Sequence, residues 1–275
     1  MSVLPYRKRT VQPSHPVAVD RSNSLTDKLT ALFYPIGGQF VDVANNKFPT
    51  TDTSTQRVGK LGRYREYSNQ DTRFANIPAY HLTGACTLIL VLDVDALTNY
   101  GALISCQDSA TTNGYELRLG NGSSGSEIVM IRANTSWNNS FVTAGNQITA
   151  GTKDNFIALT FANGLIETDP TFYNINGTKH TAFTTTSPST GAAVASTDDF
   201  RVGRRYDTVT KLDGAINFIA MFDREMSFAE TEQIRANPYN LLQPRTQFLD
   251  ITVEAAPSSF EPGWAMGVNT LIGGF

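Results

Sequence analysis

The sequence has no long hydrophobic run and little charge. No apolar stretch approaches the roughly 18 residues that a membrane-spanning helix needs, and no hydrophobic segment follows the first charged residues, as it would in a secretory signal. Charged residues are only 17% of the chain and the net charge is −3, unlike the basic surface of a nucleic-acid binder. We therefore expect synthesis in a cytoplasm, with neither a membrane nor nucleic acid as partner.

Cysteine and histidine are also scarce. Cys86 and Cys106 are too few for a disulfide framework in 275 residues. They lie in neighbouring strand-like segments, so a disulfide between them is an alternative, but buried free thiols are favoured. The histidines His15, His81 and His180 have no partner at zinc-ligand spacing, and no glycine-rich phosphate loop opens a helix. The sequence predicts no metal and no cofactor.

Several segments have the pattern of apolar and polar residues that is typical of β-strands. Residues 86–94 form a nearly continuous apolar run, which predicts a strand buried on both faces. Residues 114–119 alternate between apolar and polar, as a half-exposed strand does. Asn176-Gly177 follows another apolar run and favours a tight hairpin, because both residues accept positive φ. Further strands are expected over 127–131, 156–161, 171–175, 200–203 and 215–222.

One short helix is predicted over about 227–236. Ser227 can cap its first turn and Glu230, three residues later, completes a capping box. Asn237-Pro238 ends it, because the residue before proline avoids the α region. Many short strands with a single helix predict an all-β fold, an antiparallel two-sheet jelly-roll sandwich.

The two ends of the chain differ from its middle. Residues 1–30 contain Pro5, Pro13 and Pro16 and lack periodicity, which predicts an extended N-terminal arm. Residues 31–244 form the sandwich, with 44–62 as a polar loop, and 245–275 form a C-terminal arm. Both arms carry large apolar or basic side chains suited to partner contacts: Tyr6, Arg7, Lys8, Arg9, Trp264 and Phe275.

The later strands resemble the laminin-G-like, concanavalin A-like jelly-roll family over roughly residues 30–236. The resemblance is carried by Phe200-Arg201-Val202-Gly203, Leu212-Asp213-Gly214-Ala215-Ile216, and Phe222-Asp223-Arg224-Glu225-Met226-Ser227 with Glu230 and Ile234. Val202 stands where the family has Ile, and Met226 where it has Leu. The resemblance implies two packed sheets and a binding or structural role.

A narrower resemblance points to members of this family encoded by tailed bacteriophages. It is carried by Ser14-His15-Pro16, by Asn237-Pro238-Tyr239-Asn240-Leu241-Leu242-Gln243-Pro244, and by the glycine-rich end, although Leu242 replaces an aromatic residue. It implies a virion structural protein, either a head decoration or cement protein or a tail-associated one. Its partners would be major capsid or tail proteins and further copies of itself in a homo-oligomer, and its location the virion.

The same fold hosts glycoside hydrolases, so a catalytic role depends on particular residues. Those enzymes need two carboxylates converging on one bond, and strand geometry requires them at alternate positions. Asp93-x-Asp95 is the nearest approach and reads as a pair of strand-end acids. With Asn99 and Asp108 it is a weak match to a calcium site. We therefore expect no catalytic residue and no metal site.

A carbohydrate-binding, lectin-like module or host-receptor adhesin is the alternative function. It needs an exposed aromatic ring beside amides, on which a sugar can stack. Trp137, flanked by Asn138 and Asn139, is the candidate, in what reads as a polar loop. The competing interpretation of Trp137 is a loop anchor packed on the edge of the sandwich.

Overall fold

The computed structural model describes residues 12–13, 17–98, 100–108, 113–120, 126–134, 137–143, 147–186, 190–206 and 211–244, with the backbone alone for 137–139 and 244. These residues belong to one compact unit, Met1–Arg245, and a second unit comprises Thr246–Phe275. None of the helices in the described part of the chain has the length and apolar character that a bilayer crossing requires.

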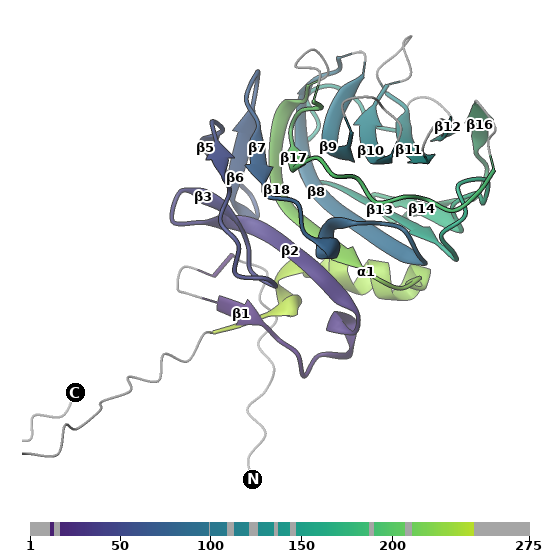
Figure 1. Ribbon diagram of the computed structural model, residues 1–275. Coiled ribbons are helices and arrows are strands. Elements are labelled where there is room, and N and C mark those ends of the chain that lie inside the picture. The colour runs from purple at the N-terminus through teal and green to yellow at the C-terminus, as the bar shows by residue number, and fades with distance from the viewer. Residues whose placement is uncertain are drawn as a thin grey trace, which may run out of the picture. The chain divides into compact units, whose positions relative to one another are not determined.

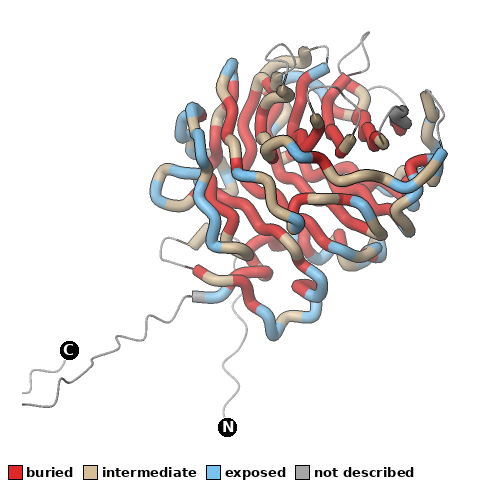
Figure 2. Tube along the Cα trace, viewed as in Figure 1, coloured by how far each residue is buried: buried red, intermediate tan, exposed pale blue. Residues whose placement is uncertain are grey.

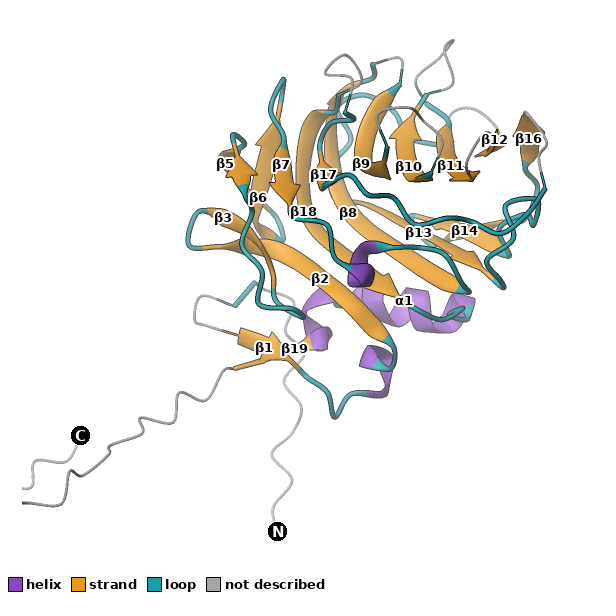
Figure 3. Cartoon of the chain, viewed as in Figure 1, coloured by secondary structure: helices purple, strands orange, loops and turns teal. Residues whose placement is uncertain are grey.

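Two large antiparallel sheets build the fold (Figures 1 and 3), which confirms the predicted all-β sandwich. The eight-stranded sheet has the order β16 (Thr184–Thr186), β12 (Trp137–Val142), β11 (Ile128–Asn134), β10 (Gly114–Leu119), β9 (Gly101–Gln107), β17 (Phe200–Val202), β7 (Thr72–Phe74) and β4 (Thr51–Asp52).

The nine-stranded sheet has the order β15 (Thr178–His180), β14 (Phe172–Ile175), β13 (Asn155–Phe161), β8 (Cys86–Ala96), β18 (Asp213–Phe222), β2 (Leu29–Ile36) and β3 (Gln39–Asp42). Its other two strands are β6 (Gly62–Tyr67), which also pairs with β18, and β5 (Thr55–Gly59), which pairs with β6. A separate ribbon joins β1 (Val17–Val19) to β19 (Leu242–Pro244).

The main core lies between the two large sheets. Strand β8 contributes alternate residues to it, among them Leu88, Leu90 and Leu92. Its other face contributes Ile89 and Val91 to a second core. The predicted burial of both faces of this strand is therefore confirmed, and Figure 2 shows the central strands buried along most of their length.

The second core covers the outer face of the nine-stranded sheet. The helix α1 (Phe228–Ala236) and the 3-10 turns η3 (Pro238–Leu241) and η1 (Ser24–Thr26) pack there with the β1–β19 ribbon, and Figure 1 shows α1 on the side of this sheet away from β9, β10 and β11. Ile234, Tyr239 and Leu241 are its buried anchors. Part of the segment 237–244, which resembles a segment of phage proteins, is thus packed into the second core.

Local signals explain the helix and one hairpin. Ser227 accepts a hydrogen bond from the Glu230 N–H, and the Glu230 carboxylate accepts one from the Ser227 N–H, which confirms the capping box. The helix ends at Ala236, before Asn237-Pro238. Asn176 and Gly177 both have positive φ, 53° and 90°, between β14 and β15, as the hairpin prediction requires.

Two predicted irregular segments are structured. Residues 17–30 were expected in the N-terminal arm, but Val17, Val19 and Leu25 are buried in the second core. The arm prediction overlooked that short apolar segments can be ordered by packing alone. The expected loop 44–62 holds β4, β5 and the first residue of β6, whose Thr-rich sequence suits a partly exposed sheet edge.

Candidate functional site

The outer face of the eight-stranded sheet is the one that α1 does not cover, and it carries a polar row. Residues that are directly paired across strands point to the same face. The strand register places eight residues in one such line, namely Thr186, Ser140, Ile131, Glu116, Ser105, Arg201, Arg73 and Thr51. Their chain neighbours Leu117, Phe74 and Val202 point into the main core.

Glu116 lies between two arginines near the middle of this row. Its carboxylate is 3.4 Å from a guanidinium nitrogen of Arg205 and 3.8 Å from one of Arg118. Glu116 is fully buried, and the Arg118 side chain is 10% exposed. Burial lowers the pKa of Arg118 and the nearby charge of Arg205 lowers it further, although Glu116 opposes both. The sheet therefore holds a partly desolvated charge cluster at its centre.

Two tyrosines lie against these arginines. The Tyr100 ring centre is 4.6 Å from the Arg118 guanidinium carbon, and the Tyr206 ring centre is 5.1 Å from that of Arg205. Tyr100 is 42% exposed, in the turn that leads into β9, with a positive φ of 63°. An exposed tyrosine ring in contact with an arginine offers a surface on which a sugar ring can stack.

A second pair of arginines continues the row on β17 and β7. Arg201 and Arg73 are directly opposite each other, and Asp71 lies between them, 2.5 Å from Arg73 and 3.8 Å from Arg201. Burial and the charge of Arg73 lower the pKa of Arg201. We call this surface the arginine face and define it by Arg73, Arg118, Arg201 and Arg205 with Asp71 and Glu116.

The β9–β10 hairpin aligns Glu116 and Arg118 on this face. Gly114 opens β10 with a φ of +95°, and a Cβ there would lie 1.9 Å from the Cys106 carbonyl oxygen, so only glycine fits the approach. The alternation over 114–119 predicts one shared face for Glu116 and Arg118, which the register confirms. The predicted half exposure of this strand is wrong, because all six residues of β10 are buried.

The residues predicted to contact glycan lie in the same sheet. Trp137, Asn138 and Asn139 begin β12, paired with Asn134, Ala133 and Arg132 of β11. The loop predicted here is therefore wrong, because the segment extends a hairpin, while the side chains of these three residues are outside the description. The predicted partner contacts Tyr6, Arg7, Lys8, Arg9, Trp264 and Phe275 also lie outside the described residues.

The remaining candidate acids are held by nearby groups. Asp95 is bound by Arg57 and Lys153, both of which also lie near Asp93. Asp108, from the weak calcium match, accepts hydrogen bonds from the Ser196 hydroxyl and the Thr197 N–H. These contacts give each carboxylate a structural role.

Both cysteines are free and buried, as the preferred interpretation predicted. Burial raises the pKa of the Cys86 thiol to about 11 and that of Cys106 to about 12. A thiol in this state is a weak nucleophile at neutral pH. Both side chains belong to the main core.

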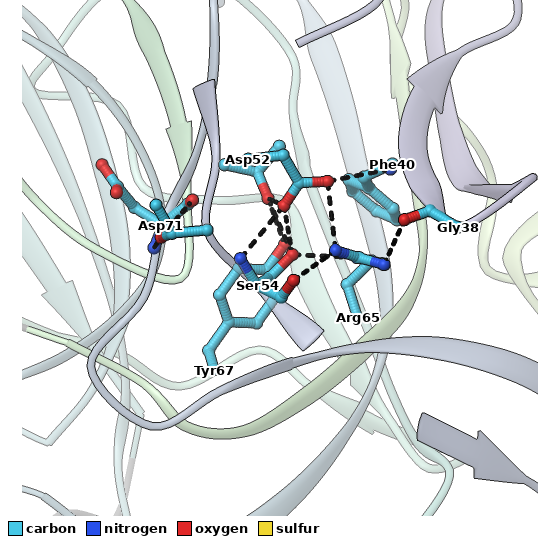
Figure 4. A network of polar contacts seen from close by, with 9 residues as sticks. Gly38, Phe40, Asp52, Ser54, Arg65, Tyr67 and Asp71 are labelled. Carbon is cyan, nitrogen blue, oxygen red and sulfur yellow. Dashed lines mark hydrogen bonds and ion pairs between the residues drawn. The ribbon is translucent and has the colours of Figure 1, made fainter. Parts of the chain in front are cut away.

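A dense polar network lies inside the sandwich, between the β2–β3 turn and strands β4, β6 and β7 (Figure 4). Arg65 donates to the Ser54 hydroxyl at 2.8 Å and to the carbonyl oxygens of Ser54 and Gly38, and its guanidinium is 3.2 Å from the Asp52 carboxylate. Asp52 also accepts from Thr72 at 3.0 Å. Each group is engaged within the protein, which indicates a structural network that links the two sheets.

Two cavities among the described residues lie beside the nine-stranded sheet. One of about 590 Å³ lies beside the end of α1, where Arg235 and Asp154 line it with the apolar Val91 and Phe156. Arg235 is already paired with Glu232 at 2.7 Å, and Asp154 accepts from the Tyr64 hydroxyl. Another of about 340 Å³, beside β1, is mainly apolar. The second cavity is lined by the exposed ring of Phe48 and by Asn46, together with apolar residues of β1, β2 and β3.

No protein-family model and no curated protein matches this chain. Solved structures do share its fold. The binding domain of a mosquitocidal protein from Paraclostridium is 13% identical over 77% of this chain and 52% of that chain, with a TM-score of 0.55. The binding domain of botulinum neurotoxin serotype G is 13% identical over 75% and 50%, also at 0.55.

The third similar structure is smaller. Domain 4 of a GH43 extracellular arabinanase from Geobacillus stearothermophilus, solved with arabinotriose, is 16% identical over 76% of this chain and 98% of that chain, with a TM-score of 0.52. This chain thus spans about half of the toxin domains and nearly all of the arabinanase domain. At these identities the comparisons show only that this chain has a β-sandwich fold.

Proposed function

We propose that this protein is a lectin-like glycan-binding module and that the arginine face is its binding surface. The proposal rests on the environment of Tyr100. Its ring is exposed to solvent and stacks on Arg118, which lies beside Glu116. An aromatic ring with adjacent charged donors and acceptors is the usual chemistry of a sugar site, because the ring packs on the apolar face of the sugar and the polar groups bind its hydroxyls. The arabinotriose bound by the similar arabinanase domain supports the same class of ligand.

Replacing Tyr100 with alanine should weaken glycan binding about two- to tenfold, since ring stacking contributes about 0.5–1.5 kcal/mol. A glycan array would identify a ligand, and titration calorimetry would compare the variants. Tyr100→Trp should preserve binding, because it keeps a flat ring at the same place.

Two controls accompany this measurement. Phe48→Ala removes a ring that is 60% exposed at the other sheet and should leave binding unchanged. Trp137→Ala tests the residue that the sequence predicts. A loss with Trp137→Ala and none with Tyr100→Ala would move the site to the β11–β12 hairpin and contradict the assignment to Tyr100.

We also infer that binding occurs without turnover. The nearest approach to a catalytic carboxylate pair, Asp93 with Asp95, lies beside Arg57 and Lys153, which supports a structural role for it. Glu116 lies within ion-pair distance of Arg118 and Arg205, and these contacts support a structural role for it as well.

A virion structural role, as a head decoration, cement or tail-associated protein, is the second candidate function. It is supported by the run Asn237–Pro244, which resembles phage proteins, and it is compatible with glycan binding by an adhesin on a particle. We expect the chain to co-purify with virions made in a bacterial host, and mass spectrometry of purified particles checks this. A protein found only free in the lysate would contradict the virion role and leave glycan binding intact.

A further inference from the structure

We propose that the cavity of about 590 Å³ beside the end of α1 is a binding site for a small zwitterion with an apolar body, the chemistry of an apolar amino acid or a short apolar peptide. Asp154 binds the ammonium group of this ligand, and Lys60 binds its carboxylate. The residues that line the cavity belong to the nine-stranded sheet, its turns and the end of α1. The site is therefore separate from the arginine face and does not depend on the proposed function.

Segments that are far apart in the sequence form the walls of this cavity. They are the β5–β6 turn, strand β8, the start of β13, the β14–β15 turn, and the end of α1 with η3. The Tyr239 hydroxyl ties η3 to the β5–β6 turn by donating to the Leu61 carbonyl oxygen at 2.6 Å. The Asn176 side chain ties the β14–β15 turn to β13 by accepting from the Phe156 N–H at 2.8 Å. The cavity is thus pre-formed, and its volume lies within the range of about 300–1,000 Å³ that is usual for small-molecule sites.

Much of the lining of the cavity is apolar. Val91 and Phe156 are direct cross-strand partners on β8 and β13, and both side chains belong to the second core. Leu61 adds apolar surface from the β5–β6 turn, and Pro238 adds it from η3. An apolar body that enters this space is removed from water, which favours its binding.

Two opposite charges line the same cavity without being paired. Lys60 is exposed and Asp154 is half-buried. Among the described residues, no ion pair includes either of them. The other charged residue in the described lining, Arg235, is held by both carboxylate oxygens of Glu232, at 2.8 and 2.7 Å. A ligand with one positive and one negative group therefore complements the two charges that remain.

Asp154 is positioned by its backbone and by one neutral donor. Its φ is 54°, in the left-handed region, which Asp and Asn accept more readily than most residues other than glycine. Its N–H donates to the Asp93 carboxylate at 2.8 Å, and its own carboxylate accepts from the Tyr64 hydroxyl. A hydroxyl group orients the carboxylate without neutralising it. The negative charge of Asp154 thus stays available to an ammonium group.

Compounds that share a phenyl ring separate the roles of the two charges. Phenylalanine carries both charges, phenethylamine only the positive one and hydrocinnamate only the negative one, and the dipeptide phenylalanyl-phenylalanine is a zwitterion of greater span. In titration calorimetry with the full chain, at least one zwitterion should bind about tenfold more tightly than either singly charged compound, because it makes one more charge-assisted contact. Zwitterion affinity no higher than that of a singly charged compound, or no binding by any of the four, would overturn the inference.

Substitutions of the two charged residues should act on different compounds. Lys60→Gln should weaken zwitterion binding about tenfold and leave phenethylamine binding unchanged. Asp154→Asn should weaken zwitterion binding by a similar factor and leave hydrocinnamate binding unchanged. Asparagine has the same shape, accepts the same φ and still offers an oxygen to the Tyr64 hydroxyl. Equal weakening of every compound by both variants would contradict the assignment of the two charges.

Two controls establish where the zwitterion binds. Lys47→Gln removes another exposed lysine, which lies between Asn46 and Phe48 of the smaller cavity, and should have no effect. A loss with Lys47→Gln would place the site at that cavity and overturn the inference. Tyr100→Ala should leave zwitterion binding unchanged, and Lys60→Gln should leave glycan binding unchanged. Failure of either proposal is therefore distinguishable from failure of the other.

Discussion

Phe33→Ala should lower the free energy of unfolding by about 3–5 kcal/mol, the usual cost of removing a buried phenylalanine. Phe33 is fully buried at the centre of an aromatic cluster. Its ring centre is 4.9 Å from that of Phe74, 5.0 Å from Phe200 and 5.3 Å from Tyr80. Phe33 belongs to the nine-stranded sheet, and Phe74 and Phe200 belong to the eight-stranded sheet. The substitution therefore opens a cavity where the two sheets meet.

Urea unfolding of the wild type and three variants measures this effect. Phe33→Leu keeps much of the volume and should cost less than Phe33→Ala. Phe48→Ala removes an exposed ring and should change stability by about 0.5 kcal/mol or less. If Phe33→Ala cost no more than Phe48→Ala, the cluster would not be the main contact between the sheets.

The parts of the fold that could be predicted are those with a strong local signal. The apolar run at 86–94 is long enough to identify a strand buried on both faces. Ser227 with Glu230, and Asn176 with Gly177, act through backbone geometry that needs no distant partner. Trp137 was misassigned because its polar neighbours read as a loop, whereas pairing with β11 makes the segment a strand.

The arginine face could be predicted only in part. Alternation over 114–119 placed Glu116 and Arg118 on one side of a strand. Arg201 and Arg205 lie near Glu116 because β17 pairs with β9. These two strands are about a hundred residues apart along the chain. No local pattern reports such long-range pairing. Tyr100 could have been noticed as an aromatic residue in a turn between two strands, but its contact with Arg118 depends on the folded hairpin.

Arg65→Met should also destabilise the protein by about 3–5 kcal/mol, for an electrostatic reason. The Arg65 side chain is 5% exposed and that of Asp52 is 7% exposed, with 3.2 Å between their charged atoms. Removing the guanidinium leaves the Asp52 carboxylate buried without its cation, and leaves the carbonyl oxygens of Ser54 and Gly38 without this donor. The loss of solvation for an unpaired buried charge is the dominant cost.

A double-mutant cycle distinguishes this account from a simple loss of packing. Arg65→Met combined with Asp52→Asn should cost less than the sum of the two single substitutions, because the second change removes the charge that the first leaves unpaired. Arg57→Met removes a partner of Asp95 in a more exposed pair, with side chains 24% and 34% exposed, and should cost about 0–1 kcal/mol. Additive effects in the cycle would mean that Arg65 contributes through its aliphatic stem, and that the network in Figure 4 joins the sheets by packing alone.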